Sequence, residues 1–175
     1  TAVALADGTT AYRLDCPRAI SVTQVAAGTS RNFTVTGYDY YGQKMSEVIA
    51  STAGSTVNGK KAFFQVTSIA VSGATTTAVT VGTVDVFGAP VKFSDKGYLA
   101  RVGWAGVLAE DAATVVVGDA TTATTTTGDV RGTVVPSSSA DGSRRLVVAI
   151  LLTGIQCGPN STRAGAMGVN QNLAS

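Results

Sequence analysis

The sequence predicts an all-β fold: an antiparallel β-sandwich of the jelly-roll or a related Greek-key kind, with extended terminal arms. Short apolar–polar alternations fill residues 33–90, and this period of two is typical of strands with one buried face. Turn-forming pairs interrupt the alternation at near-regular intervals: Tyr41-Gly42, Asn58-Gly59, Ser72-Gly73 and Gly88-Ala89. The spacing of three and four residues that would indicate helices is nearly absent.

The strands predicted in the first half of the chain are residues 11–15, 21–26, 32–38, 44–51, 61–71 and 78–87. Pro17 is expected to end the first of them. Gly42 lies in the turn after the third strand, where glycine can take the positive φ that tight turns often need. In the fourth strand Met45, Val48 and Ile49 do not alternate cleanly, which is compatible with a bulge.

Residues 61–71 form the strongest predicted strand. Apolar side chains fall on both of its faces, with Phe64 and Val66 on one and Phe63 and Ile69 on the other. A strand of this kind is typical of the centre of a sheet that is covered on both sides.

The second half of the chain gives a looser pattern. Between residues 98 and 117 two glycines each lower helix propensity by about 1 kcal/mol, so we expect a strand and a loop there. The threonine-rich residues 119–127 favour an exposed strand or an ordered loop, because the branched Cβ of threonine resists helix formation. Residues 129–136 predict another strand. The uninterrupted apolar run of residues 146–152 predicts a buried one.

The composition indicates a chain that hides surface against neighbours. Charged residues make up 14% of the 175, against about 25% in typical soluble domains, and charge is depleted at the centre of protein interfaces. The net charge of +2 and the isolated pairs Lys60-Lys61 and Arg144-Arg145 do not form the basic stripe of a nucleic-acid binder. The longest apolar runs are shorter than the ~20 residues a membrane helix needs. We expect neither nucleic acid nor membrane as a partner.

These observations predict one domain over residues 11–157. An N-terminal arm of residues 1–10, ordered only against a partner, precedes it, and a tail of residues 158–175 follows. A chain of this length buries roughly 70% of its unfolded surface and needs no disulfide or metal to fold. Cys16 and Cys157 would join an early strand to a late one if they paired; in a reducing cytosol both would stay free thiols. No secretory signal is recognisable at the start of the sequence.

No catalytic, metal or cofactor constellation stands out. The chain contains no histidine, which removes the commonest general base, the commonest metal ligand and the usual catalytic triads. The acidic residues fall mostly at predicted turns, as expected for solvated caps; they include Asp39, Glu47, Asp85, Glu110 and Asp111. We therefore expect no enzyme activity and no cofactor.

The candidate functional residues are instead candidates for contact with a protein partner. Tyr38, Tyr40 and Tyr41 cluster at one turn, and alternation places Tyr38 and Tyr40 on one face and Tyr41 on the other. Tyrosines at the end of a sheet serve as core lids or as protein–protein anchors. Trp104, the single tryptophan, is expected to be an anchor in the core or in a subunit contact.

Asp129 and Arg131 form a second kind of candidate. Two residues apart on a predicted strand, they share a face. One interpretation is an ion pair at the strand edge, worth about 0–1 kcal/mol when exposed. The other is a contact to another subunit, in which the planar guanidinium meets a partner carboxylate.

Several segments, taken in order, resemble small structural proteins of tailed bacteriophages. They are TGYDYYG ahead of Glu47, GKKAF leading into VTSIAVSG, VGTVDVFGAP, GDVRGT, and a serine-rich loop that ends in Asp141-Gly142. Each piece is short, and the ordered set, which spans about residues 30–150, is the specific feature. The resemblance implies a virion protein, and within that class a capsid cement, or decoration, protein.

Such proteins are typically β-rich oligomers on the outside of a shell built from an HK97-like major capsid protein. The resemblance therefore implies the major capsid protein as partner, a homo-oligomer (dimer or trimer), and a place on the capsid exterior after synthesis in the bacterial host cytoplasm. It brings no catalytic motif. Residues 1–7 and 160–175, the latter with Arg163, are expected to be arms that contact the shell.

Two alternatives remain open. The first is another virion component: a tail, head–tail adaptor or head-fibre protein, which would share the β fold and the low charge. The second is a non-viral, secreted carbohydrate-binding module, which would bind sugar through Tyr38, Tyr40 or Trp104.

Overall fold

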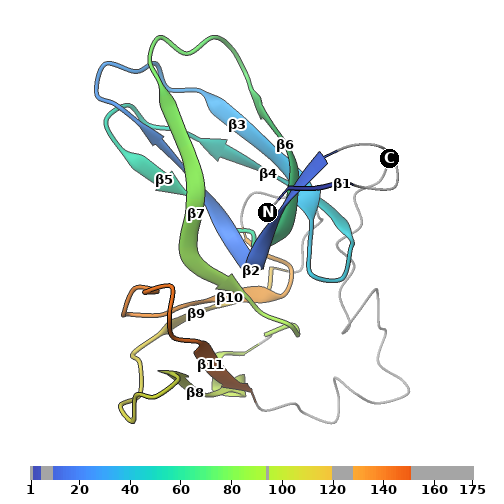
Figure 1. The fold of residues 1–175 in the computed structure, drawn as a ribbon, viewed down its shortest axis with the longest axis vertical. Helices are drawn as coiled ribbons and strands as arrows, with labels where there is room; N and C mark the ends of the chain where they lie inside the picture. The colour runs from blue at the N-terminus through green and yellow to red at the C-terminus, as the bar shows by residue number, and fades with distance from the viewer. Residues whose placement is uncertain (1, 5–9, 94, 120–127, 151–175) are drawn as a thin grey trace.

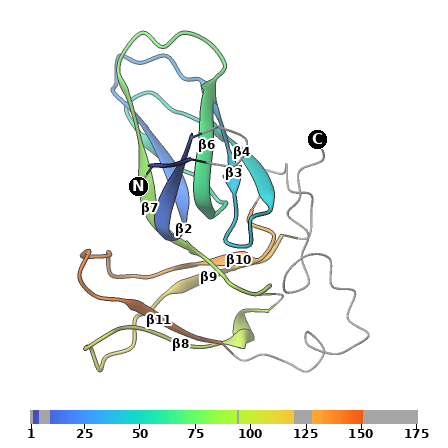
Figure 2. The ribbon, with the colours of Figure 1, turned by 45° about the vertical axis from the view of Figure 1, so that its right-hand side comes forward.

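The computed structural model describes residues 2–4, 10–93, 95–119 and 128–150. Its regular structure is antiparallel β apart from one 3-10 turn, so the predicted fold class is confirmed. Over residues 10–88 the main sheet curls into a half-barrel, and the last strands of that sheet lie beyond one end of it with a small two-stranded sheet (Figure 1). The turned view in Figure 2 shows the same separation, with β7 running from the upper part into the lower one.

The main sheet has the order β4-β3-β6-β2-β7-β10-β9, and β1 and β5 also pair with β2. Its strands are β1 (Ala2–Ala4), β2 (Thr10–Gln24), β3 (Asn32–Tyr38), β4 (Lys44–Ala50), β5 (Thr56–Asn58), β6 (Phe63–Val71), β7 (Val79–Gly88), β9 (Thr114–Val117) and β10 (Gly132–Val135). The 3-10 turn Lys96–Tyr98 leads into β8 (Leu99–Trp104), which pairs with β11 (Leu146–Ile150) to form the second sheet.

Two hydrophobic cores divide the molecule. The core of the half-barrel, residues 10–88, is built from the buried side chains of Ile20, Val22, Phe33, Val35, Met45, Ile49, Phe63 and Val66. The core of the lower unit, the described residues from 89 to 150, is built from Ala89, Val91, Phe93, Val102, Val115 and Val134. The pairing of β10 with the end of β7 joins the two parts, with Thr133 opposite Gly88 and Val134 opposite Phe87.

The first long strand, β2, differs from the prediction. It is one strand of 15 residues that passes through Pro17, instead of two strands separated by it. The ladder with β6 shifts register between Arg13 and Arg18, and the ladder with β7 shifts between Arg18 and Ile20. Proline is tolerated in a strand at such irregularities, because no ladder hydrogen bond is required of it there. The bulge expected in β4 is absent: its pairing with β3 is continuous and its buried residues alternate.

Three further expectations differ from the structure. β6 is central, between β3 and β2, but only Phe63 and Val66 are buried, and its second half pairs with β3 but not with β2. β11 is not a buried strand over its described residues: its side chains alternate between partly buried and exposed, since the two-stranded sheet has one open face. The N-terminal arm is in part ordered by its own chain, because Ala2–Ala4 pairs with β2.

Candidate functional site

Buried charges gather where the half-barrel meets the lower unit. We call this cluster the ionic hub; it consists of Asp39, Glu47, Lys61, Asp129 and Arg131, all of which are buried. They come from the β3–β4 turn, from β4, from the loop before β6 and from the segment before β10. The expectation that the acidic residues are solvated caps is therefore wrong for Asp39 and Glu47.

The centre of the hub is an ion pair between the two parts of the molecule. Nη1 of Arg131 donates to Oδ2 of Asp39 at 2.6 Å, and both side chains are at most 4% exposed. The other oxygen of Asp39 accepts the backbone N–H groups of Tyr41 (2.9 Å) and Gln43 (2.8 Å). The guanidinium lies over the ring of Tyr41, 4.8 Å from its centroid. Arg131 of the lower unit thus fixes the tyrosine-rich turn of the half-barrel.

Asp129 makes the second link. Its Oδ2 accepts the backbone N–H of Ala62, in the half-barrel, at 3.0 Å, and its Oδ1 accepts that of Arg131 at 2.9 Å. Burial raises the pKa of Asp129, and these two hydrogen bonds and the nearby charges of Arg131 and Lys61 oppose the rise. The turn ends at Gly132, whose φ of +94° is a conformation that glycine adopts without strain. A Cβ atom added at this position would lie 2.5 Å from the carbonyl oxygen of Val116, so a larger residue would clash.

Glu47 and Lys61 complete the hub. The two oxygens of Glu47 accept the backbone N–H groups of Lys60 (2.6 Å) and Lys61 (3.1 Å). Burial raises the pKa of Glu47 and lowers the pKa of Lys61, and their opposite charges oppose both shifts. Every carboxylate of the hub accepts hydrogen bonds from the backbone, so these charges hold loops in place.

The hub also brings together several segments for which a resemblance to phage structural proteins is predicted from the sequence. TGYDYYG supplies Asp39, GKKAF supplies Lys61, and GDVRGT supplies Asp129 and Arg131. The FGAP segment joins them because the hydroxyl of Tyr41 donates to the carbonyl oxygen of Pro90 at 2.7 Å. Segments far apart in the chain are thus parts of one structural junction.

Sequence reasoning missed Glu47 and Lys61 as members of the hub. A signal was present for Glu47, which alternates with Met45 and Ile49 and therefore shares their buried face. The expected roles of Asp129 and Arg131 are corrected. Both are too deeply buried to touch another subunit, Asp129 lies before the strand, and the ion pair that Arg131 makes is with Asp39.

The β3–β4 turn displays an aromatic surface above the hub. We call Arg13, Tyr40, Tyr41 and Phe64 the tyrosine patch. Tyr40 is 58% exposed, and its ring contacts the rings of Tyr41 (centroids 5.4 Å apart) and Phe64 (5.1 Å) edge-on. The guanidinium of Arg13 lies 4.8 Å from the centroid of Phe64. The patch is therefore a set of interlocked rings at the surface.

The three tyrosines do not follow the expected alternation. Tyr38 ends β3 and is partly buried, whereas the chain turns after Asp39, so Tyr40 and Tyr41 lie side by side in the turn. Strand periodicity ends where the turn begins.

Trp104 lies in the lower unit as a buried anchor. Its Nε1 donates to Oδ2 of Asp111 at 3.2 Å. Asp111 also accepts the backbone N–H groups of Ser137 (2.6 Å) and Ser138 (3.1 Å). Burial acts to raise the pKa of Asp111, but the hydrogen bonds from the two serines outweigh it and lower the pKa. Asp111 is thus a third expected cap, after Asp39 and Glu47, that the structure shows to be buried.

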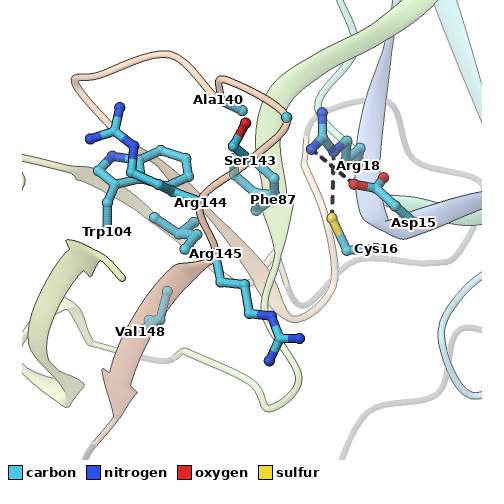
Figure 3. A pocket seen from close by; sticks show the side chains of 12 residues that line it. Asp15, Cys16, Arg18, Phe87, Trp104, Ala140, Ser143, Arg144, Arg145 and Val148 are labelled. Atoms are coloured by element: carbon cyan, nitrogen blue, oxygen red, sulfur yellow. Dashed lines mark hydrogen bonds and ion pairs between the residues drawn. The ribbon is translucent and has the colours of Figure 1, made fainter. Parts of the chain in front are cut away.

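A cleft of about 500 Å³ lies beside Trp104, between the half-barrel and the lower unit (Figure 3). On the half-barrel side Arg18 lies over the ring of Phe87 and pairs with Asp15 (3.0 Å) and Asp85 (3.5 Å). On the other side Arg144 pairs with Asp141. Carboxylates thus balance the charges of these two arginines, and a third arginine, Arg145, also lines the cleft.

Cys16 lines the same cleft, where its Sγ accepts a hydrogen bond from Nε of Arg18 at 3.4 Å. Burial raises the pKa of this thiol, which lowers its thiolate fraction and its reactivity. Cys157, Arg163 and the predicted tail of residues 158–175 lie outside the described residues, as do residues 120–127 of the threonine-rich segment.

No family model, curated protein or solved structure matches the chain. Within the described ranges, no group of three or more cysteine or acidic side chains is placed to hold a metal ion. The same part of the chain has no helix long and apolar enough to cross a membrane.

Proposed function

We propose that this protein is a non-enzymatic capsid cement protein of a tailed bacteriophage. It binds the outside of the assembled head and stabilises contacts between major capsid protein subunits. It acts without chemistry, because a protein that binds only the assembled shell stabilises it by RT ln(1 + [L]/Kd) per site, and the term is repeated over many copies.

The observation that carries the proposal is the tyrosine patch on the ionic hub. Large aromatic side chains with arginine beside them are the residues that dominate protein–protein binding energies. The rings of Tyr40, Tyr41 and Phe64 support one another, and Arg131 and Asp39 hold the turn beneath them. A surface that is already ordered loses little conformational entropy on binding, which favours a repeated contact on a lattice.

The first experiment is to count this chain against the major shell protein in purified particles by quantitative mass spectrometry. A copy number comparable with that of the shell protein is expected. A small, ring-sized number would favour the tail, adaptor or fibre alternative. Absence from particles would overturn the virion hypothesis, and binding of the isolated protein to an array of glycans would then favour the carbohydrate-binding alternative.

The second experiment tests the patch itself. Tyr40→Ala is expected to weaken binding to shells at least tenfold, within the range for a truncated hot-spot residue. Tyr12→Ala is the matched control: Tyr12 is 62% exposed, and as the neighbour of Arg13 on β2 it points to the opposite face. Both variants should unfold at the same denaturant concentration as the natural chain. Equal weakening by the two substitutions would refute a specific patch.

A further inference from the structure

Arg131 is buried with most of its hydrogen-bonding capacity unused. Its side chain is 4% exposed, and Nη1 bonds Asp39, but no group in the described part of the chain accepts a hydrogen bond from Nε or Nη2. Nearly all buried donors in folded proteins have a partner, since leaving one without costs about 1–3 kcal/mol, and more for a charged group. The two nitrogens therefore indicate an acceptor that the described residues do not supply.

A cavity adjoins this guanidinium. Its volume is about 10 Å³, and Arg131, Asp39, Asp129, Tyr41, Ala62 and Gly88 are among the residues that line it. That volume holds about one water molecule, for which roughly 10–15 Å³ is required. An anion there would lie against the carboxylates of Asp39 and Asp129, so charge excludes it.

We infer that one internal water molecule occupies this cavity, with its oxygen accepting from Nε and Nη2 of Arg131. Its two hydrogens can donate to the carboxylates that line the cavity. Asp129 retains capacity for this, because each of its oxygens has two lone pairs and accepts one backbone N–H. The water then makes the three or four hydrogen bonds that are usual for a buried water.

This water links the two parts of the molecule. Arg131 and Asp129 belong to the lower unit, and Asp39 and Ala62 belong to the half-barrel. The water adds a connection beside the direct ion pair and keeps the guanidinium under the ring of Tyr41. The inference does not depend on the proposed binding to a capsid.

The test is a crystal structure of the full chain at a resolution that shows ordered solvent, followed by a soak in sodium bromide. We expect one solvent peak within hydrogen-bond distance of both Nε and Nη2 of Arg131, without anomalous signal after the soak. A bromide signal at that position would overturn the inference in favour of an anion. A guanidinium rotated so that both nitrogens bond protein oxygens would also overturn it.

A measurement in solution gives an independent check. Water ¹⁷O relaxation dispersion of the natural chain should contain the contribution of a long-lived internal water. Arg131→Met removes both unused donors, and combining it with Asp39→Asn avoids an unpaired buried carboxylate. In this double variant the contribution should fall by one water molecule. An unchanged amplitude in a folded double variant would contradict the inference.

Discussion

The half-barrel and the lower unit reach stability by different means. β2, β3, β4, β6 and β7 have 7 to 15 residues each, and long ladders with an alternating apolar face form their core. In the lower unit β8, β9, β10 and β11 have only 4 to 6 described residues. There the buried carboxylate of Asp111 holds a loop of the same unit, and Asp129 and Arg131 bond the half-barrel. The half-barrel adds its own buried carboxylates, Asp39 and Glu47, to its long ladders, whereas the lower unit has short ladders and depends more on such side chains to pair backbone groups.

The largest expected effect comes from removing the charge that joins the two regions. Arg131→Met leaves the carboxylate of Asp39 buried without its partner, which should lower the free energy of unfolding by about 3–5 kcal/mol. Denaturant titration monitored by tryptophan fluorescence and by circular dichroism measures the loss. Trp104 reports the lower unit, and the dichroism reports mainly the larger sheet.

A double-mutant cycle distinguishes this cause from a general packing loss. Adding Asp39→Asn to Arg131→Met should recover part of the lost stability, because the unpaired charge is then gone. Strict additivity of the two substitutions would show that the ion pair does not couple the regions. If Arg131→Met does not fold, Arg131→Lys retains a charge and serves for the same cycle.

The same substitution, valine to alanine, made once in each hydrophobic core compares the two cores directly. Val35→Ala in the half-barrel and Val102→Ala in the lower unit each remove a buried valine side chain, for about 2 kcal/mol. Hydrogen exchange read by mass spectrometry should show that Val102→Ala increases exchange mainly in residues 95–119 and 128–150. Val35→Ala should increase exchange throughout, because the lower unit relies on the half-barrel. Identical exchange patterns would mean that the molecule unfolds as one unit.

Lowering the pH should destabilise the lower unit by protonating Asp111. The pKa of Asp111 is lowered in the folded chain, so the stability that its ionised form contributes is complete above about pH 4. It is lost as pH falls through the folded-state pKa. Asp111→Asn should cost about 1–2 kcal/mol near neutral pH, for lost hydrogen bonds, and the difference from the natural chain should shrink below pH ~4. A difference that stays constant with pH would contradict the assignment.

The smallest effect is expected at Leu108, which lies in the loop after β8 and is 96% exposed. Leu108→Ser should change the free energy of unfolding by no more than about 0.5 kcal/mol, because the side chain packs against little. Thermal melts of the two chains measure this. A marked loss would show that Leu108 contacts a part of the chain beyond the described residues.

The half-barrel could largely be predicted from the sequence, and the reasons are local. β3 has its predicted bounds, because an alternating run is followed by Asp39, whose side chain accepts backbone N–H groups in the turn. Gly42 takes the positive φ, +76°, that the turn residue suggested. The bounds of a strand and the conformation of a turn residue depend on residues close together in the sequence, so side-chain periodicity and turn preferences predict them.

The hub could not be predicted, because its partners are distant in the chain. Arg131 and Asp39 are 92 residues apart, and nothing near either one indicates the other. The prediction that Pro17 ends the first strand was wrong for a related reason. The prediction used only the local effect of proline, whereas β2 continues through Pro17 because it pairs with both β6 and β7, with a shift in register. The aromatic patch was identified, but the ring contacts depend on a turn geometry that alternation does not describe.

The separation of Asp39 and Arg131 also sets an order of events during synthesis. The ribosome synthesises β2, β3 and β4 long before Arg131, so Asp39 in a nascent half-barrel has no guanidinium partner. The ladder of β2 is likewise incomplete until β7 has been made. Contacts this distant close slowly. A chain that stops before residue 131 leaves the carboxylate of Asp39 without its guanidinium partner, so the half-barrel of such an incomplete chain should be less stable. The later-made segment that carries Arg131 thus completes the part of the molecule that is made first.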